Sequence, residues 1–166
     1  MQISNLALAY IVEELRPLVV GAFVNKVQEI GKGTFKLKLH TKDGSKDLVV
    51  TDKALFLSDY AFPVRENPNT FFVKLKNSLL NKKIVSISQF ELDRVVVIEF
   101  SELFLILELF QDSNIILTDK AFDVLQLLYQ KEWKDRELKK GKKYVFPKTN
   151  KENPAKVSGE TLFEQF

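Results

Sequence analysis

The sequence predicts an α+β fold, in which helices flank an antiparallel β-sandwich or flattened barrel. The first observation is that two amphipathic helical patterns stand among about eight or nine short runs with strand character. The second is that turn signals separate these runs at intervals of about 8–12 residues, which is typical of sandwiches and barrels. The third is that some runs alternate apolar and polar residues, as strands with one buried face do.

The first helix is predicted to start after Ser4. A serine hydroxyl can accept a backbone N–H bond from the first turn of a helix. The apolar residues that follow recur at helical spacing and predict one buried face: Leu8, Ile11, Val12, Leu15, Leu18 and Val19. Pro17 and Gly21 are expected to end this helix.

Strand patterns follow at residues 23–30, 34–41, 45–51 and 54–58. In residues 34–41, apolar side chains alternate with Lys36, Lys38 and His40, so we expect these three to face water. Two prolines in residues 60–69 predict a loop. Asn69 or Thr70 then caps a second helix that ends near Asn81.

Residues 84–89 and 95–100 are expected to form a hairpin with Asp93 and Arg94 at its exposed tip. The alternative, one continuous strand, puts Arg94 among apolar side chains, where a charge needs a partner. Further strands are expected at residues 103–110, 114–118 and, as the last, 124–129. Asp93 and Arg94 are then either a binding site or a structural ion pair.

The composition, with 45% hydrophobic and 28% charged residues, favours a soluble globular domain. The absence of cysteine excludes disulfides and thiolate chemistry. No run of about 18 apolar residues predicts a membrane span, and the basic start of a secretion signal is missing. We therefore expect no membrane partner and a cytoplasmic location.

The basic excess lies late in the chain. Residues 131–156 hold ten Lys and Arg against four Asp and Glu, a net charge of +6. This segment is either a phosphate-binding patch or a solvated linker. We place a domain boundary at 130, with a sandwich domain at 1–130 and a basic exit segment at 131–166. Residues 158–164 look like the start of a helix, so we expect a longer protein.

Binding is a better prediction than catalysis. The single histidine, His40, is expected on a water-facing strand position, where it is usually inert. Common motifs for zinc, nucleotide and acyl-transfer chemistry do not occur, so we expect no enzyme activity, cofactor or metal site. Lysines of the second helix, Arg94 and the late basic segment can contact a nucleic-acid backbone. Trp133 either stacks on a base or covers a sheet edge.

Five segments together resemble the N-terminal domain of NFACT proteins, the family that includes NEMF and RqcH. The segments, with spacing intact, are the first helix with Gly21–Ala22–Phe23–Val24–Asn25–Lys26–Val27, the helix Phe72 through Leu75–Lys76 to Leu79, Leu92–Asp93–Arg94–Val95–Val96, Leu107–Glu108–Leu109 with Asn114 to Asp119, and Arg136–Glu137–Leu138 with Gly141, Tyr144 and Pro147.

The resemblance implies a fold similar to the N-terminal domain of formamidopyrimidine-DNA glycosylases. It implies a non-catalytic domain whose partners are tRNA, the large ribosomal subunit with peptidyl-tRNA, and the remaining NFACT domains of the same protein. The role is to recruit tRNA for C-terminal tailing of stalled nascent chains. The implied tRNA-binding residues are Asp93, Arg94, Lys76 and Lys26.

Two positions depart from the family pattern. Ala7 stands where many members have an acid in the first helix, and Lys76–Asn77 replaces an Arg–Lys pair, which removes the bidentate guanidinium. Two alternatives stay open: a degenerate glycosylase-like DNA-binding domain, and a protein-interaction sandwich. Glycosylase activity itself is disfavoured, because the chain begins Met1–Gln2–Ile3 and lacks the N-terminal proline and glutamate of that chemistry.

Overall fold

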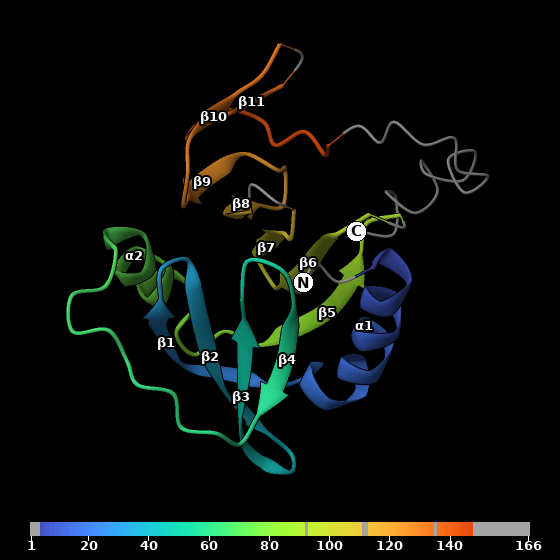
Figure 1. Ribbon diagram of the computed structural model, residues 1–166, viewed down its shortest axis with the longest axis vertical. Coiled ribbons are helices and arrows are strands. Elements are labelled where there is room, and N and C mark those ends of the chain that lie inside the picture. The colour runs from blue at the N-terminus through green and yellow to red at the C-terminus, as the bar shows by residue number, and fades with distance from the viewer. Residues whose placement is uncertain (1–3, 92, 111–112, 135, 148–166) are drawn as a thin grey trace.

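The computed structural model describes residues 4–147, except 92, 111–112 and 135 (Figure 1). The elements are α1 (Asn5–Val19), β1 (Phe23–Gly31), β2 (Thr34–Thr41), β3 (Gly44–Val50), β4 (Leu55–Ser58), α2 (Thr70–Leu79), β5 (Ile84–Gln89), β6 (Val95–Phe100), β7 (Leu103–Glu108), β8 (Asn114–Asp119), β9 (Val124–Leu127), β10 (Lys131–Glu132) and β11 (Glu137–Leu138). The predicted α+β class with antiparallel sheets is confirmed. Leu92 and the helix expected at 158–164 lie outside the described residues.

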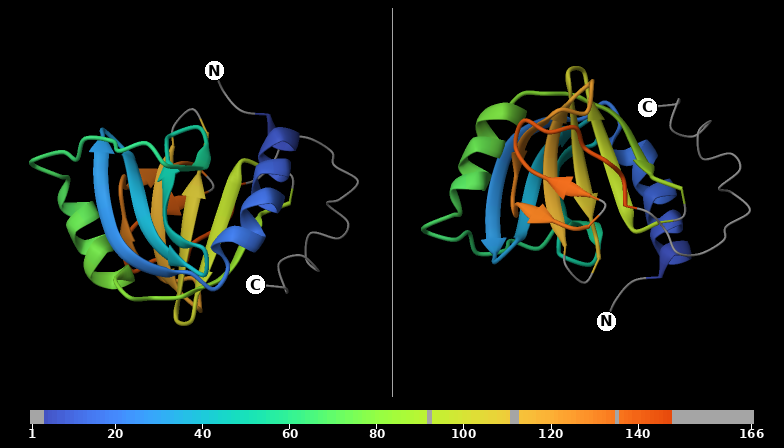
Figure 2. Two further views of the ribbon diagram at one scale, coloured as in Figure 1. Left: turned by 90° about the horizontal axis from the view of Figure 1, so that it is seen from below. Right: turned by 90° about the horizontal axis from the view of Figure 1, so that it is seen from above.

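Two antiparallel sheets, β1-β2-β3-β4 and β5-β6-β7-β8-β9, form the body of the domain. Figure 2 shows one helix at each side of the pair of sheets. Helix α1 contacts the edge strands β4 and β5, while α2 contacts the edge strands β1 and β9. Each helix thus covers one edge of both sheets, and exposed edges are what other chains pair with.

Both helices begin at the predicted caps. The Ser4 Oγ accepts a bond from the Ala7 N–H (3.0 Å), and the Asn69 Oδ1 accepts one from the Phe71 N–H (2.9 Å). Pro17 does not end α1, contrary to our expectation. A proline has no N–H to donate, but α1 continues past it to Val19, and the Val20 N–H donates to the Arg16 carbonyl at 3.1 Å.

The first core lies between the two sheets and contains the inward side chains of β2 that the alternation predicts: Phe35, Leu37 and Leu39. The expectation for Lys36 was wrong. It lies on the outer face, opposite Val49, yet only 8% of it is exposed. Its Nζ lies 3.5 Å from the Asp47 carboxylate, which compensates the buried charge.

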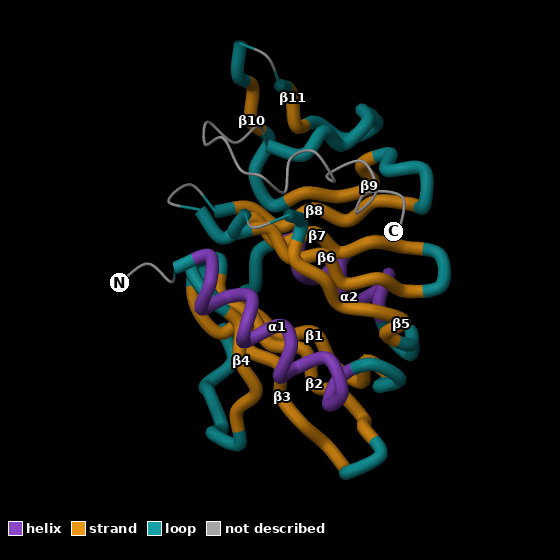
Figure 3. The backbone as a smooth tube through the Cα atoms, turned by 90° about the vertical axis from the view of Figure 1, so that its right-hand side faces the viewer, coloured by secondary structure: helices purple, strands orange, loops and turns teal. Residues whose placement is uncertain are grey.

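A second core covers the other face of the β5–β9 sheet. It joins strand residues such as Val95 and Ile106 to Leu138 and Tyr144 of the segment that follows β9. The expectation that residues 124–129 form the last strand was wrong, because β10 and β11 pair beyond them (Figure 3). A sheet buried on both faces explains why β6 and β7 are almost continuously apolar.

The two sheets are joined at one corner, where β1 and β5 begin. The Gly21 N–H donates to the Ile84 carbonyl and the Ile84 N–H to the Ala22 carbonyl, both at 2.8 Å. Gly21 has φ +91, which glycine adopts without strain. This joint makes the sandwich resemble a flattened barrel on that side. The expected likeness to glycosylases stays a prediction.

Candidate functional site

The turn between β5 and β6 carries Asp93 and Arg94. It is closed by backbone bonds from the Phe90 N–H to the Val95 carbonyl (2.9 Å) and from the Asp93 N–H to the Phe90 carbonyl (3.1 Å). Glu91 has φ 49, a left-handed conformation that is uncommon outside glycine. Such a conformation persists where the surroundings fix it, so neighbouring contacts hold the backbone at Glu91.

Gln89 fixes this turn against the start of α1. Its Nε2 donates to the Asp93 carbonyl (2.8 Å) and to the Asn5 carbonyl (3.1 Å). On the other side, the Leu109 N–H donates to the Arg94 carbonyl (2.8 Å). The predicted hairpin is confirmed, but its tip is not fully exposed. Both Asp93 and Arg94 are half-buried, because the turn lies against α1 and the end of β7.

Arg94 and the start of α1 favour an anionic ligand at this turn, and the Asp93 carboxylate beside them can accept hydrogen bonds from that ligand. The Arg94 guanidinium makes no hydrogen bond or salt bridge to any residue in the described part of the chain. The first turn of α1, whose Asn5 carbonyl accepts from the same Gln89 amide that bonds the Asp93 carbonyl, contains no acidic residue. A helix N-terminus favours negative charge. Arginine can bind a phosphate through two parallel N–H bonds.

Lys26 and Lys76 lie elsewhere. Lys26 is on β1 and Lys76 on the last turns of α2, both exposed. The Asn81 N–H just after α2 donates to the Val24 carbonyl (2.8 Å), so these segments meet where β1 begins. The six residues of β5 separate this corner from the Asp93 turn. At about 3.3 Å per residue, that distance is roughly 20 Å. The structure therefore divides the four predicted residues into two groups.

In the described part of the exit segment, Arg136 and Tyr144 form a buried polar cluster with Glu108, while the lysines of this segment at 134, 139, 140, 142 and 143 are exposed. Arg136 forms a salt bridge with Glu108, which is 1% exposed, and the Tyr144 hydroxyl donates to Glu108 Oε2 (2.6 Å). Burial, and then the charge of Glu108, hold the pKa of Tyr144 well above its usual range. Trp133 is half-exposed, and the Arg136 Cζ lies 4.9 Å from the centre of its ring. The cluster attaches the segment to the sheet.

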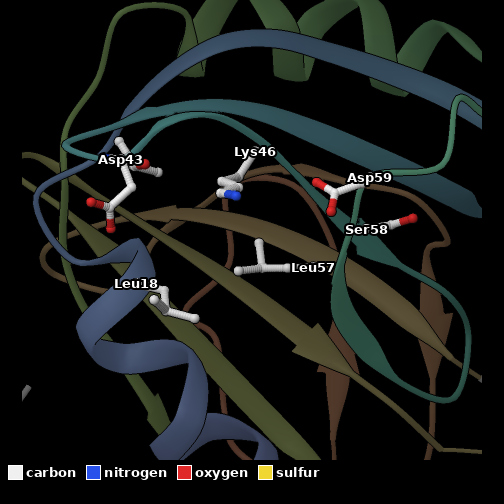
Figure 4. A pocket seen from close by; sticks show the side chains of 7 residues that line it. Leu18, Asp43, Lys46, Leu57, Ser58 and Asp59 are labelled. Carbon is white, nitrogen blue, oxygen red and sulfur yellow. Dashed lines mark hydrogen bonds between the residues drawn. The ribbon is translucent and has the colours of Figure 1, made fainter.

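A cavity of about 220 Å³ opens between the end of α1, the β2–β3 turn and the end of β4 (Figure 4). It is lined by Leu18, Thr41, Asp43, Lys46, Leu57, Ser58 and Asp59. None of the predicted site residues is among them. Sequence reasoning missed this cavity because its lining comes from separate elements and contains no motif.

The described residues contain no candidate metal site. No group of three His, Cys, Asp or Glu among them could hold a metal ion. His40 is exposed on β2, as predicted. No helix in the described part of the chain is long and apolar enough to cross a membrane.

The chain belongs to the NFACT family: residues 4–166 match the family of NFACT N-terminal and middle domains. It is 29% identical to the archaeal Rqc2 homolog aRqcH of Methanocaldococcus jannaschii, over 99% of this chain and 26% of that protein. It is 28% identical to ribosome quality control complex subunit 2 of Saccharomyces cerevisiae, over 76% of this chain and 13% of that protein. The chain therefore spans about a quarter or less of the length of these relatives.

The fold is similar to that of a solved bacterial domain. The N-terminal domain of the fibronectin-binding protein PavA from Streptococcus pneumoniae superimposes with a TM-score of 0.82 at 28% identity, covering 96% of this chain and 67% of that one. The overall fold described above is thus shared with a domain of known structure.

Proposed function

We propose that this chain is a non-catalytic tRNA-binding domain of a cytoplasmic ribosome quality-control factor. Its partners are tRNA, the large ribosomal subunit with peptidyl-tRNA, and the remaining NFACT domains. In this proposal the whole factor recruits tRNA for C-terminal tailing of stalled nascent chains. Membership of the family and the names of the relatives support the ribosomal role. Residues 131–166 lead from the sandwich toward the next domain.

The observation that carries the proposal is the Asp93–Arg94 turn. Gln89 holds its backbone against α1, so the backbone that carries the two side chains is fixed before any ligand arrives. Arg94 binds a phosphate or a base edge, and Asp93 accepts from a nucleotide amine or a ribose 2′-OH. Lys26 and Lys76 make separate contacts with the tRNA phosphate backbone at the other end of β5. Their contribution is electrostatic and falls with salt.

The test is tRNA binding by the wild type and by the double variant Asp93→Ala/Arg94→Ala. A lost charge-assisted hydrogen bond costs about 1.5–3 kcal/mol. We therefore expect affinity for total tRNA to fall roughly tenfold to hundredfold. The measurement is fluorescence anisotropy at low salt, with thermal unfolding recorded for every variant.

A matched control removes the same pair of charges from another turn. Lys42 and Asp43 are adjacent and exposed in the β2–β3 hairpin. The Lys42→Ala/Asp43→Ala variant should bind tRNA like the wild type. The proposal is wrong if the Asp93→Ala/Arg94→Ala variant unfolds normally and still binds tRNA with wild-type affinity. A preference for duplex DNA over tRNA in competition would favour the glycosylase-like alternative.

A further inference from the structure

The corner where the two sheets join carries an exposed aromatic side chain. Phe23, at the start of β1, is 44% exposed. It lies opposite His40 of β2 and, across the joint, opposite Lys83 just before β5. Residues directly opposite in antiparallel strands place their side chains on the same face. A row of His40, Phe23 and Lys83 therefore crosses the outside of the molecule, and all three residues are exposed.

Unpaired positive charge surrounds this phenylalanine. In the neighbouring row, Lys26 of β1 lies opposite Lys38 of β2. Within the described residues, Lys26, Lys38 and Lys83 form no salt bridge. The carboxylate opposite Lys38 belongs to Asp47, which is engaged by Lys36 at 3.5 Å. The face formed by Phe23, His40, Lys26, Lys38 and Lys83, here called the Phe23 face, is thus an aromatic ring among cations.

We propose that the Phe23 face binds single-stranded RNA, with an unpaired base stacked on the Phe23 ring and the backbone phosphates on Lys26, Lys38 and Lys83. Aromatic side chains within a basic groove bind single strands without strong sequence preference, because every base has a flat face to stack. A β-sheet face with an exposed aromatic residue is a common platform for such stacking.

Charge favours RNA over a protein partner. Lysine is depleted in protein–protein interfaces, whereas three unpaired lysines around one ring match a phosphate backbone. The Phe23 face lies at the opposite end of β5 from the Asp93 turn, so it is a second contact area. The inference rests on the proposed function in one respect, the RNA partner, and it gives Lys26 a defined role beside Phe23.

The first test measures binding of a fluorescent single-stranded RNA of about 12 nucleotides to the wild type, Phe23→Ala and Phe23→Trp. Loss of base stacking should weaken binding about five- to hundredfold in Phe23→Ala, while Phe23→Trp keeps a stacking surface and should bind like the wild type. Phe56→Ala is the matched control. Phe56 is 40% exposed on the same outer face but lies opposite the buried Val49. Its loss should leave RNA binding unchanged.

The second test measures the salt dependence of the same binding. Each phosphate contact adds about 0.7 to the slope of log affinity against log salt for a single strand. Lys26→Ala/Lys38→Ala should therefore lower the slope by about 1.4. On the outer face Lys26 is exposed and Lys38 is half-buried, and neither belongs to a core, so the variant also serves if Phe23→Ala fails to fold.

The inference is overturned if Phe23→Ala binds the RNA like Phe56→Ala and the slope of Lys26→Ala/Lys38→Ala equals that of the wild type. It is also overturned if the short RNA does not bind the wild type and Phe23→Ala instead weakens binding of the remaining NFACT domains. The proposed function fails separately, through tRNA binding that is insensitive to Asp93→Ala/Arg94→Ala. Each failure thus has its own readout.

Discussion

Glu108 is a carboxylate inside the second core, and its two partners come from the segment after β9. The Tyr144 hydroxyl donates to it at 2.6 Å, and Arg136 neutralises its charge. Replacing Tyr144 by Phe removes one hydrogen bond to a buried charged group, which costs about 1–3 kcal/mol. We expect Tyr144→Phe to unfold at lower urea at about pH 8. An unchanged unfolding midpoint would contradict the role of this hydrogen bond.

The same pair of proteins gives a pH test at the residue scale. Burial raises the pKa of Tyr144 in the folded state well above the ordinary tyrosine value of 10.0, so the unfolded chain loses this proton first. The contribution of the protonated Tyr144 hydroxyl to the free energy of unfolding is complete below pH 10, and it is lost as pH rises above that value. The stability difference between wild type and Tyr144→Phe should therefore be smaller at about pH 11 than at about pH 8. The other tyrosines are common to both proteins and serve as the control.

At the scale of elements, the start of α1 links the helix to the Asp93 turn. The Ser4 hydroxyl caps the Ala7 N–H, and the nearby Asn5 carbonyl receives Gln89. Ser4→Ala should cost about 1 kcal/mol and lower the melting temperature by roughly 2–4 °C. Ser4→Asp preserves an accepting oxygen and should melt like the wild type. Equal melting of the alanine and aspartate variants would show that the cap does not stabilise α1.

Local chemistry explains which elements could be predicted. The caps at Ser4 and Asn69 and the alternation in β2 are encoded within a few residues, so the sequence alone located these elements. β10 and β11 were missed, because their segment places isolated apolar residues such as Leu138 among charges without a period. These apolar residues are buried against the outer face of the β5–β9 sheet, and no local sequence pattern indicates that contact.

The site was predictable only in part for the same reason. The Asp93–Arg94 pair was found because both residues stand together in one turn and within one motif. Their half-burial was missed, because it depends on Gln89 reaching the start of α1. The Phe23 face was invisible, since Phe23 and His40 become neighbours only through strand pairing. Residues brought together by pairing leave no spacing signal in a sequence.

At the scale of the whole molecule, the described part of the exit segment is a layer over the β5–β9 sheet. The sequence places a domain boundary at 130, and two shortened chains test it. A chain of residues 1–130 lacks Arg136, Leu138 and Tyr144, so the outer face of the sheet is exposed and Glu108 loses both partners. A chain of residues 1–147 keeps them all.

We expect the 1–147 chain to unfold cooperatively and the 1–130 chain to be largely unfolded or aggregated. Leaving a buried charge without its partner costs about 3–5 kcal/mol, and the exposed apolar face adds to that loss. Domains of this kind are stable by only about 5–15 kcal/mol, so the sum removes much of the total. Circular dichroism during heating and binding of a hydrophobic dye measure the difference. A 1–130 chain that melts cooperatively near the temperature of the 1–147 chain would place the boundary at 130 after all, and would make the layer an appended segment.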